Sequence, residues 1–238
     1  MAAPAESNST PNPDLQVSLP DVVKFVRQLA HDLRNHLNAA ELQSAYLAEV
    51  AEEPELKEEI KRLRTMVSEV GANLQSLTAA LSQPRLTEMP YSAADFVGDL
   101  QQKLAAEHPD ESTKVQWNAQ MEDASLQIDP QVLLPALTEL FANAFRHNRG
   151  EGVISIEARI DGESFLFTLR EPKQSFERST ENWGREPMQS VSQGHYGLGL
   201  HRTRSIIEAH RGQINARYDS RSSSLITTVV LPLAETTV

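Results

Sequence analysis

The chain of 238 residues contains no cysteine, which excludes disulfide bonds, thiolate metal sites and thiol catalysis. Aromatic residues make up only 5% of it, so a hydrophobic core must be mainly aliphatic. No apolar run approaches the roughly 18 residues that a membrane span requires. The first 20 residues also lack the basic and then apolar pattern of a secretory signal. We therefore expect a cytoplasmic protein without a membrane span.

Positive charge is scarce as well. Lys and Arg number 22 against 33 Asp and Glu, which gives a net charge of −11. A chain this acidic repels a phosphate backbone, so we do not expect nucleic acid as a partner. The hydrophobic content of 39% is enough for a core, and the length suits two small domains.

Residues 1–18 are rich in Pro, Ser, Asn and Ala without periodicity, which is typical of a disordered tail. A helix is predicted next, because Ser18 is a capping residue and Pro20 suits a first helical turn. Apolar residues then recur in steps of three and four, at Val22, Phe25, Val26, Leu29, Leu33, Leu37, Ala40 and Leu47. This helix should end near Val50, before Pro54.

A second helix is predicted from a heptad pattern that ends before Pro84. Its apolar positions are Leu56, Ile60, Leu63, Val67, Val70, Leu74, Leu77 and Leu81. Two long helices joined by a short turn make an antiparallel hairpin. Such a hairpin has more apolar surface than its own two helices cover, so we predict a homodimeric four-helix bundle through residues 19–84. Packing against the chain's own second domain is the alternative.

Residues 85–238 have shorter elements and indicate an α+β domain, with mostly antiparallel strands and helices on one face. Helices are predicted over 92–108, 129–147 and 199–210, and strands around 115–117, 126–128, 153–160, 164–170, 213–218 and 225–231. Residues 86–91 are expected to be a connector. Residues 172–196 have no periodicity, and a stretch of that length is typical of a lid.

The first segment whose side chains could take part in a reaction is HDLRNHL, at residues 31–37. His31 lies beside the apolar stripe, within reach of solvent, and a neutral imidazole is a nucleophile near pH 7. Asp32 can fix the tautomer of the ring, and Asn35 is one turn further along the same face. A single helical histidine is most often simply solvated. A zinc pair is disfavoured, because His31 and His36 are five positions apart rather than four.

The second segment covers residues 139–147. Glu139 and Asn143 share one face of the predicted helix, and a carboxylate with an amide oxygen suits Mg²⁺ and its waters. Arg146 lies one turn from Asn143, where it can meet a phosphate group. An ordinary polar helix face is the simpler interpretation of this segment taken alone.

The third segment is the glycine cluster at residues 194–200, directly before a predicted helix. Glycines let backbone amides approach a phosphate group, and a helix N-terminus adds positive potential. A tight loop-to-helix turn at Gly199 is the alternative.

In this order and spacing, the three segments resemble the catalytic core of bacterial sensor histidine kinases. Residues 31–37 resemble the phosphoacceptor box, and residues 139–147 resemble the asparagine box of the GHKL ATP-binding fold. Residues 197–200 resemble the second glycine box, and residues 210–212 resemble the His-Gly-Gly segment that follows its helix. The resemblance covers about residues 19–238.

The resemblance implies a histidine-bearing hairpin at residues 19–84 and a Bergerat-type α/β sandwich at residues 85–238. It implies ATP and Mg²⁺ as cofactors and a response-regulator receiver domain as the partner. The implied catalytic residues are His31, Asp32, Asn35 and Glu139. The implied nucleotide-binding residues are Asn143, which also holds the metal, Arg146, His147, Glu171, Gly197, Leu198 and Gly199.

The sequence departs from the family pattern where the family has an adenine-binding Asp followed by two glycines. Here residues 169–175 contain neither glycine, Glu171 stands in place of the Asp, and Pro172 stiffens the turn. His195 also replaces a glycine, and His36 stands where the family usually has proline. The alternative function is therefore a dimeric phosphotransferase or pseudokinase scaffold with a non-functional nucleotide site. A serine kinase of the same ATP-binding fold would not explain the histidine hairpin.

Overall fold

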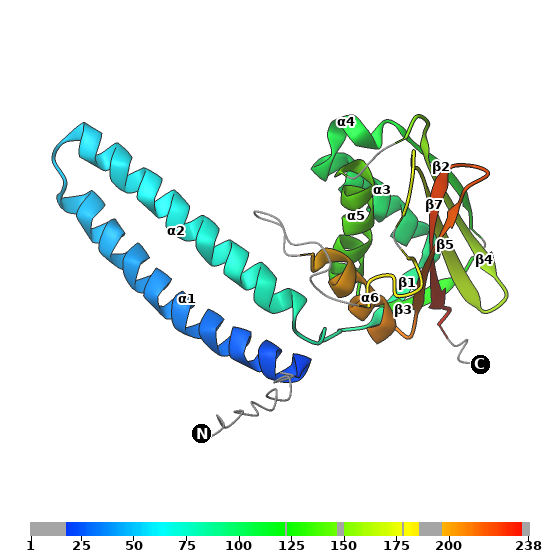
Figure 1. The fold of residues 1–238 in the computed structure, drawn as a ribbon, viewed down its shortest axis with the longest axis horizontal. Helices are drawn as coiled ribbons and strands as arrows, with labels where there is room; N and C mark the ends of the chain where they lie inside the picture. Colours follow the sequence, from blue (N-terminus) through cyan, green and yellow to red (C-terminus); the bar gives the residue numbers. More distant parts are fainter. Residues whose placement is uncertain (1–17, 122, 147–149, 178, 186–196, 235–238) are drawn as a thin grey trace, which may run out of the picture. The chain divides into compact units, whose positions relative to one another are not determined.

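A computed structural model of the chain describes residues 18–234, except residues 122, 147–149, 178 and 186–196. The chain divides into two compact units, Met1–Thr78 and Ala79–Val238 (Figure 1). The tail expected over residues 1–18 lies, apart from Ser18, outside the described residues.

The first unit is a pair of helices that run antiparallel side by side (Figure 1). They are α1, Leu19–Val50, and α2, Pro54–Ala80, whose last two residues belong to the second unit. The hydroxyl of Ser18 accepts a hydrogen bond from the N–H of Asp21, so the predicted cap is confirmed. The helical hairpin expected from the hydrophobic periodicity is also confirmed.

The side chains that the first unit buries are mostly small. Ala30 and Ser44 are almost fully buried, as are Ala51 and Ile60. Large apolar side chains of the two predicted stripes remain exposed, among them Phe25, Leu29, Leu33, Leu47, Leu56, Leu63 and Val70. A single copy of the hairpin therefore leaves a substantial apolar surface in contact with water.

The second unit has a five-stranded sheet in the order β2-β4-β5-β7-β6. The strands are β2 (Val115–Gln120), β4 (Ile154–Asp161), β5 (Ser164–Pro172), β6 (Gln213–Asp219) and β7 (Ser224–Pro232). Only β2 and β4 are parallel, and the other pairs of this sheet are antiparallel. Helices α3 (Ala93–Glu107), α5 (Pro130–Arg146) and α6 (Gly199–Ala209) lie on one face of the sheet, and α4 (Pro109–Ser112) is a single turn (Figure 1). The predicted α+β fold is confirmed.

A second, two-stranded sheet pairs β1 (Met89–Ser92) with β3 (Ser125–Ile128). The prediction of a plain connector over residues 86–91 was wrong, because β1 begins inside it. Pro90 weakened the strand signal, since proline cannot donate a hydrogen bond to a neighbouring strand. The strand forms nevertheless because it pairs on one side only, which is where proline is tolerated.

The core lies between the five-stranded sheet and the helices. Alternate residues of β5, Phe165, Phe167 and Leu169, are fully buried. Phe165 meets Phe96 of α3, and Phe167 meets Phe141 of α5, with ring centroids 6.1 and 6.2 Å apart. This face of β5 therefore points toward the helices, and any side chain that continues the stripe lies in the same layer.

Candidate functional site

His31 lies near the middle of α1 with its side chain exposed to solvent. Its Nδ1 is 3.2 Å from Oδ1 of Asp32, and the same oxygen accepts a hydrogen bond from the side-chain amide of Gln28 at 3.0 Å. When Nδ1 of a neutral imidazole carries the proton, Nε2 keeps its lone pair. The contact with Asp32 therefore favours a tautomer whose Nε2 is available as a nucleophile.

Asn35 is exposed one turn beyond His31, and its side chain has no polar contact with a described residue. His36 is also exposed, and α1 continues through it without interruption. Its position brings no second imidazole to His31, because neighbours on one helix face are three or four residues apart.

The second and third motifs meet where α5 passes the start of α6. A Cβ atom added to Gly199 would lie 2.3 Å from Oε1 of Glu139. The carboxylate of Glu139 therefore occupies the space that a side chain on residue 199 would need. The buried hydroxyl of Thr203 donates a hydrogen bond to the carbonyl of Ala136 at 3.0 Å, which fixes the two helices to each other beside this contact.

The backbone conformation of the segment that leads into α6 depends on Gly197. Gly197 has φ +62°, a left-handed conformation that residues with side chains rarely adopt. Leu198 is buried and its carbonyl accepts a hydrogen bond from the N–H of Arg202, which begins the helix. The first N–H groups of a helix have no partner within it, so they are open to an anion.

Asn143 and Arg146 follow Glu139 on α5. Asn143 is half-buried, whereas Arg146 is exposed in the last turn. Glu139 and Asn143 thus share one helix face with Arg146, as the spacing predicted. His147, the remaining residue implied by the asparagine box, lies outside the described residues.

Glu171 continues the stripe of β5 that points toward the helices, and it is 6% exposed. Its Oε2 is 2.9 Å from Nζ of Lys173, which is also almost fully buried. Burial raises the pKa of the Glu171 carboxyl above its usual value, and the positive charge of Lys173 opposes that rise. The carboxylate expected to bind adenine is therefore already engaged.

The sequence interpretation missed Lys173. Residues two positions apart on a strand share a face, so a Lys two residues after a buried Glu was a usable signal. The close approach of Gly150 supports this arrangement, because a Cβ atom there would lie 3.1 Å from the backbone nitrogen of Lys173.

Residues 174–185 form no helix or strand where the structure describes them, and residues 186–196 of the expected lid lie outside the described residues. The ring of Phe176 contacts those of Trp183 and Tyr218, with centroids 5.7 and 5.9 Å away. Nε of Arg204 donates a hydrogen bond to the carbonyl of Trp183 at 2.6 Å. The first part of the expected lid is therefore anchored to α6.

These residues fit a magnesium nucleotide at its phosphate end. Glu139 and Asn143 supply oxygen ligands, Arg146 supplies a cation, and the first turn of α6 supplies amides. The base end differs from the expected pattern, because the buried carboxylate of Glu171 is paired with an ammonium group.

Comparison with known proteins agrees with this geometry. Residues 128–235 match the family described as histidine kinase-, DNA gyrase B- and HSP90-like ATPase. The adaptive-response sensory kinase SasA of Nostoc is 26% identical over 215 residues, which are 80% of this chain and 52% of that protein. The chain is therefore similar to sensor histidine kinases over most of its length, and to this ATPase family over residues 128–235.

A further relative of this chain is the alginate biosynthesis sensor protein KinB of Pseudomonas aeruginosa. It is 25% identical over 203 residues, which cover 82% of this chain and 34% of KinB. Full-length ShkA, crystallised in complex with AMPPNP, has the same fold, with a TM-score of 0.65 and 16% identity over 89% of this chain and 46% of ShkA. This chain spans about half the length of SasA. No helix among the residues that the structure describes is long and apolar enough to cross a membrane.

Proposed function

We propose that the protein is an ATP-dependent histidine kinase of a two-component system. The phosphoryl group moves from ATP to His31 and then to an aspartate in the receiver domain of a response regulator. The observation that carries this proposal is the contact between Glu139 and Gly199, which joins the two nucleotide-binding motifs at the start of α6. The sensory kinase names of the relatives support it.

In this proposal each residue of the nucleotide site has one task. The first-turn amides of α6 and the guanidinium of Arg146 hold the phosphate groups. Asn143 holds Mg²⁺, which neutralises charge that develops on the phosphate oxygens. Glu139 lies beside the attacking group. Glu171 contacts the base with one carboxylate oxygen while Lys173 retains the other.

His31 is the acceptor. Its Nε2 forms the bond to the γ-phosphorus as the bond from that phosphorus to the bridging oxygen of the leaving ADP breaks. The proton on Nδ1 remains there, held by Asp32 at 3.2 Å, and Asp32 stabilises the positive charge that the ring acquires. Asn35 can orient a water molecule for the reverse, dephosphorylating reaction.

The hairpin also supports a homodimer. Its exposed apolar side chains would be covered by a second copy in a four-helix bundle. The same bundle would display His31 to a receiver domain.

Labelling with γ-³²P-ATP and Mg²⁺ tests the acceptor assignment. We expect acid-labile, alkali-stable label on the wild type and none on His31→Gln, because glutamine has no nucleophilic ring nitrogen. His36→Gln is the matched control, since His36 is exposed on the same helix, and it should be labelled like the wild type. Label on His31→Gln, or its loss from His36→Gln alone, would contradict the assignment.

The ion pair between Glu171 and Lys173 favours one alternative, a histidine phosphotransferase that takes no phosphate from ATP. In that case His31 would exchange phosphate only with a receiver aspartate. The wild type would then remain unlabelled with ATP and become labelled by a phosphorylated receiver domain.

A further inference from the structure

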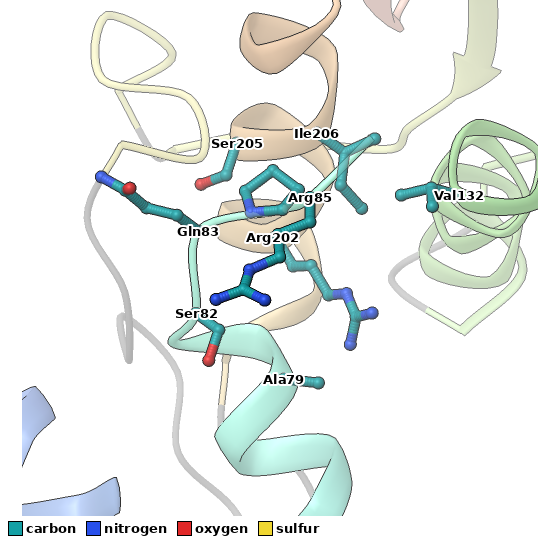
Figure 2. Close-up of a pocket in the computed structure, with 9 residues that line it drawn as sticks. Ala79, Ser82, Gln83, Arg85, Val132, Arg202, Ser205 and Ile206 are labelled. Carbon is teal, nitrogen blue, oxygen red and sulfur yellow. The ribbon is translucent and has the colours of Figure 1, made fainter. Parts of the chain in front are cut away.

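A pocket lies in the second unit, apart from the contact between Glu139 and Gly199. Its volume is about 210 Å³. The last turn of α2 and the residues after it form one side, and α6 with Val132 of α5 forms the other (Figure 2). On α6 its lining residues are Arg202, Ser205 and Ile206, whereas Thr203 of the same helix bonds to α5. Gly199 and Glu139 are not among the lining residues, so the pocket lies further along α6 than the contact between those two residues.

Two arginines line this pocket, Arg85 and Arg202. Neither guanidinium group forms an ion pair or hydrogen bond with any residue that the structure describes. Other arginines nearby are matched: Arg204 pairs with Glu208 at 2.8 Å, and Arg211 pairs with Glu88 at 2.8 Å. Two unmatched cations in one pocket are unexpected in a chain with a net charge of −11. Because like charges repel, an anion between them would be stabilised.

The rest of the lining suits an organic ligand rather than a bare ion. Ala79, Val132 and Ile206 provide apolar walls. The hydroxyl of Ser205 donates its proton to the carbonyl of His201, so toward the pocket it offers only acceptor lone pairs. Figure 2 shows both guanidinium groups pointing toward the last turn of α2, near Ala79. The positive groups and the apolar walls therefore border the same space.

The size of the pocket limits the ligand. Sites for drug-sized molecules occupy about 300–1,000 Å³, so 210 Å³ suits a molecule of one small ring or a short chain. The planar fork of an arginine matches both carboxylate and phosphate groups.

We propose that this pocket binds a small organic anion, a carboxylate or phosphate group on a short apolar stem. Arg85 and Arg202 hold the anionic group, and Val132 and Ile206 contact the stem. The bound anion links the segment that follows α2 to α6, the helix that starts at the glycine segment. This proposal does not depend on kinase activity, because none of its residues belongs to the proposed nucleotide site.

Isothermal titration calorimetry of the full chain tests the proposal with three probes of similar shape. Benzoate carries a carboxylate, phenyl phosphate carries a phosphate, and benzyl alcohol is neutral. We expect at least one anion to bind with 1:1 stoichiometry and benzyl alcohol to bind at least about tenfold more weakly, because it lacks the charge that both arginines recognise. Competition between benzoate and phenyl phosphate identifies the preferred anionic group.

The double variant Arg85→Gln with Arg202→Gln should weaken anion binding by about tenfold or more. Arg221→Gln is the matched control, because Arg221 is an exposed arginine outside the pocket, and it should bind like the wild type. Asn143→Ala should also bind like the wild type, which separates this pocket from the phosphate end of the nucleotide site. Equal binding of benzyl alcohol, unchanged affinity in the double variant, or no binding of either anion at 10 mM, roughly the weakest useful affinity, would overturn the proposal.

Discussion

Glu171 and Lys173 form a buried ion pair at the end of β5, where the side-chain stripe of that strand changes from apolar to charged. Removing one partner of such a pair leaves an uncompensated buried charge, whereas replacing both with neutral groups of similar shape is often tolerated. Substitutions of this pair therefore measure how much it contributes to the stability of the fold, as opposed to the binding of a ligand.

We expect Lys173→Met to destabilise the protein by about 3–5 kcal/mol. The double variant Glu171→Gln with Lys173→Met should be as stable as the wild type at pH 7, or up to about 4 kcal/mol more stable. Urea unfolding of the three proteins measures both effects. A single variant as stable as the wild type would show that the ion pair is not formed.

The same pair predicts a pH dependence. Burial raises the folded-state pKa of Glu171 above the value of 4.5 taken for the unfolded chain, so the folded protein binds this proton more tightly. The contribution of the protonated Glu171 carboxyl to the free energy of unfolding is fully present below pH 4.5. It is lost as the pH rises through the pKa of this group in the folded protein. The double variant lacks this titration, so its stability relative to the wild type should increase from pH 4.5 upward. A constant difference between pH 4.5 and 8 would contradict the shift.

Gly199 offers a test of the contact that defines the proposed nucleotide site. An added methyl group would displace the carboxylate of Glu139, which is the end of a flexible side chain, so Gly199→Ala should destabilise the protein by no more than about 1 kcal/mol. Gly98→Ala is the matched control, because Gly98 lies in α3 with open space around it, and it should stabilise by roughly 0.5–1 kcal/mol.

A double-mutant cycle with Glu139→Ala isolates the contact. Thermal unfolding should show that Gly199→Ala costs much less when the carboxylate has been removed. An equal cost in both backgrounds would place Glu139 away from Gly199.

Spacing along the chain placed Glu139, Asn143 and Arg146 on one face of α5, because neighbours on a helix are set by its 3.6-residue period. Asp32 was expected beside His31 because it is the next residue along the chain, and the two side chains are in contact. Lys173 was missed because the predicted strand ended at Arg170, so its two-residue spacing from Glu171 was not recognised as a shared strand face.

At the scale of elements, the hairpin of α1 and α2 raises the question of what covers its apolar side chains. Hydrophobic periodicity predicted both helices well, since each pattern is long and regular. It did not predict that Ala30 and Ser44 would be the buried positions of α1, because small side chains contribute little to a hydrophobic pattern. The larger side chains that it did identify are free to contact a second copy.

We expect Leu63 and Leu74, replaced together by polar residues, to give a monomer, because the proposed four-helix bundle would lose two apolar layers. Multi-angle light scattering measures the mass directly. Leu42→Gln is the matched control, since Leu42 is 75% exposed and lies outside the predicted stripe, and it should remain dimeric. A dimer that survives the double substitution would place the interface elsewhere.

Strands of the second unit were predicted with similar success, because β4 and β5 alternate cleanly between buried and half-buried residues. Their partners were not predictable in the same way. The parallel pairing of β2 with β4 joins segments separated by a whole helix, so it depends on tertiary packing rather than on a turn.

At the scale of the whole molecule, the proposed function joins His31 of one unit to a proposed nucleotide site in the other. In that proposed site Glu139 lies against Gly199 at the phosphate end, and Glu171 forms a buried ion pair at the base end. Whether the protein binds ATP is therefore the claim on which the kinase function depends.

Calorimetric titration of the wild type with ATP in the presence and absence of Mg²⁺ tests this claim most directly. We predict saturable 1:1 binding that requires Mg²⁺, retained in His31→Gln and lost in Asn143→Ala, because Asn143 holds the metal and His31 does not contact the bound nucleotide until transfer. Absence of saturable binding to the wild type, or Mg²⁺-dependent binding that survives Asn143→Ala unchanged, would contradict the account.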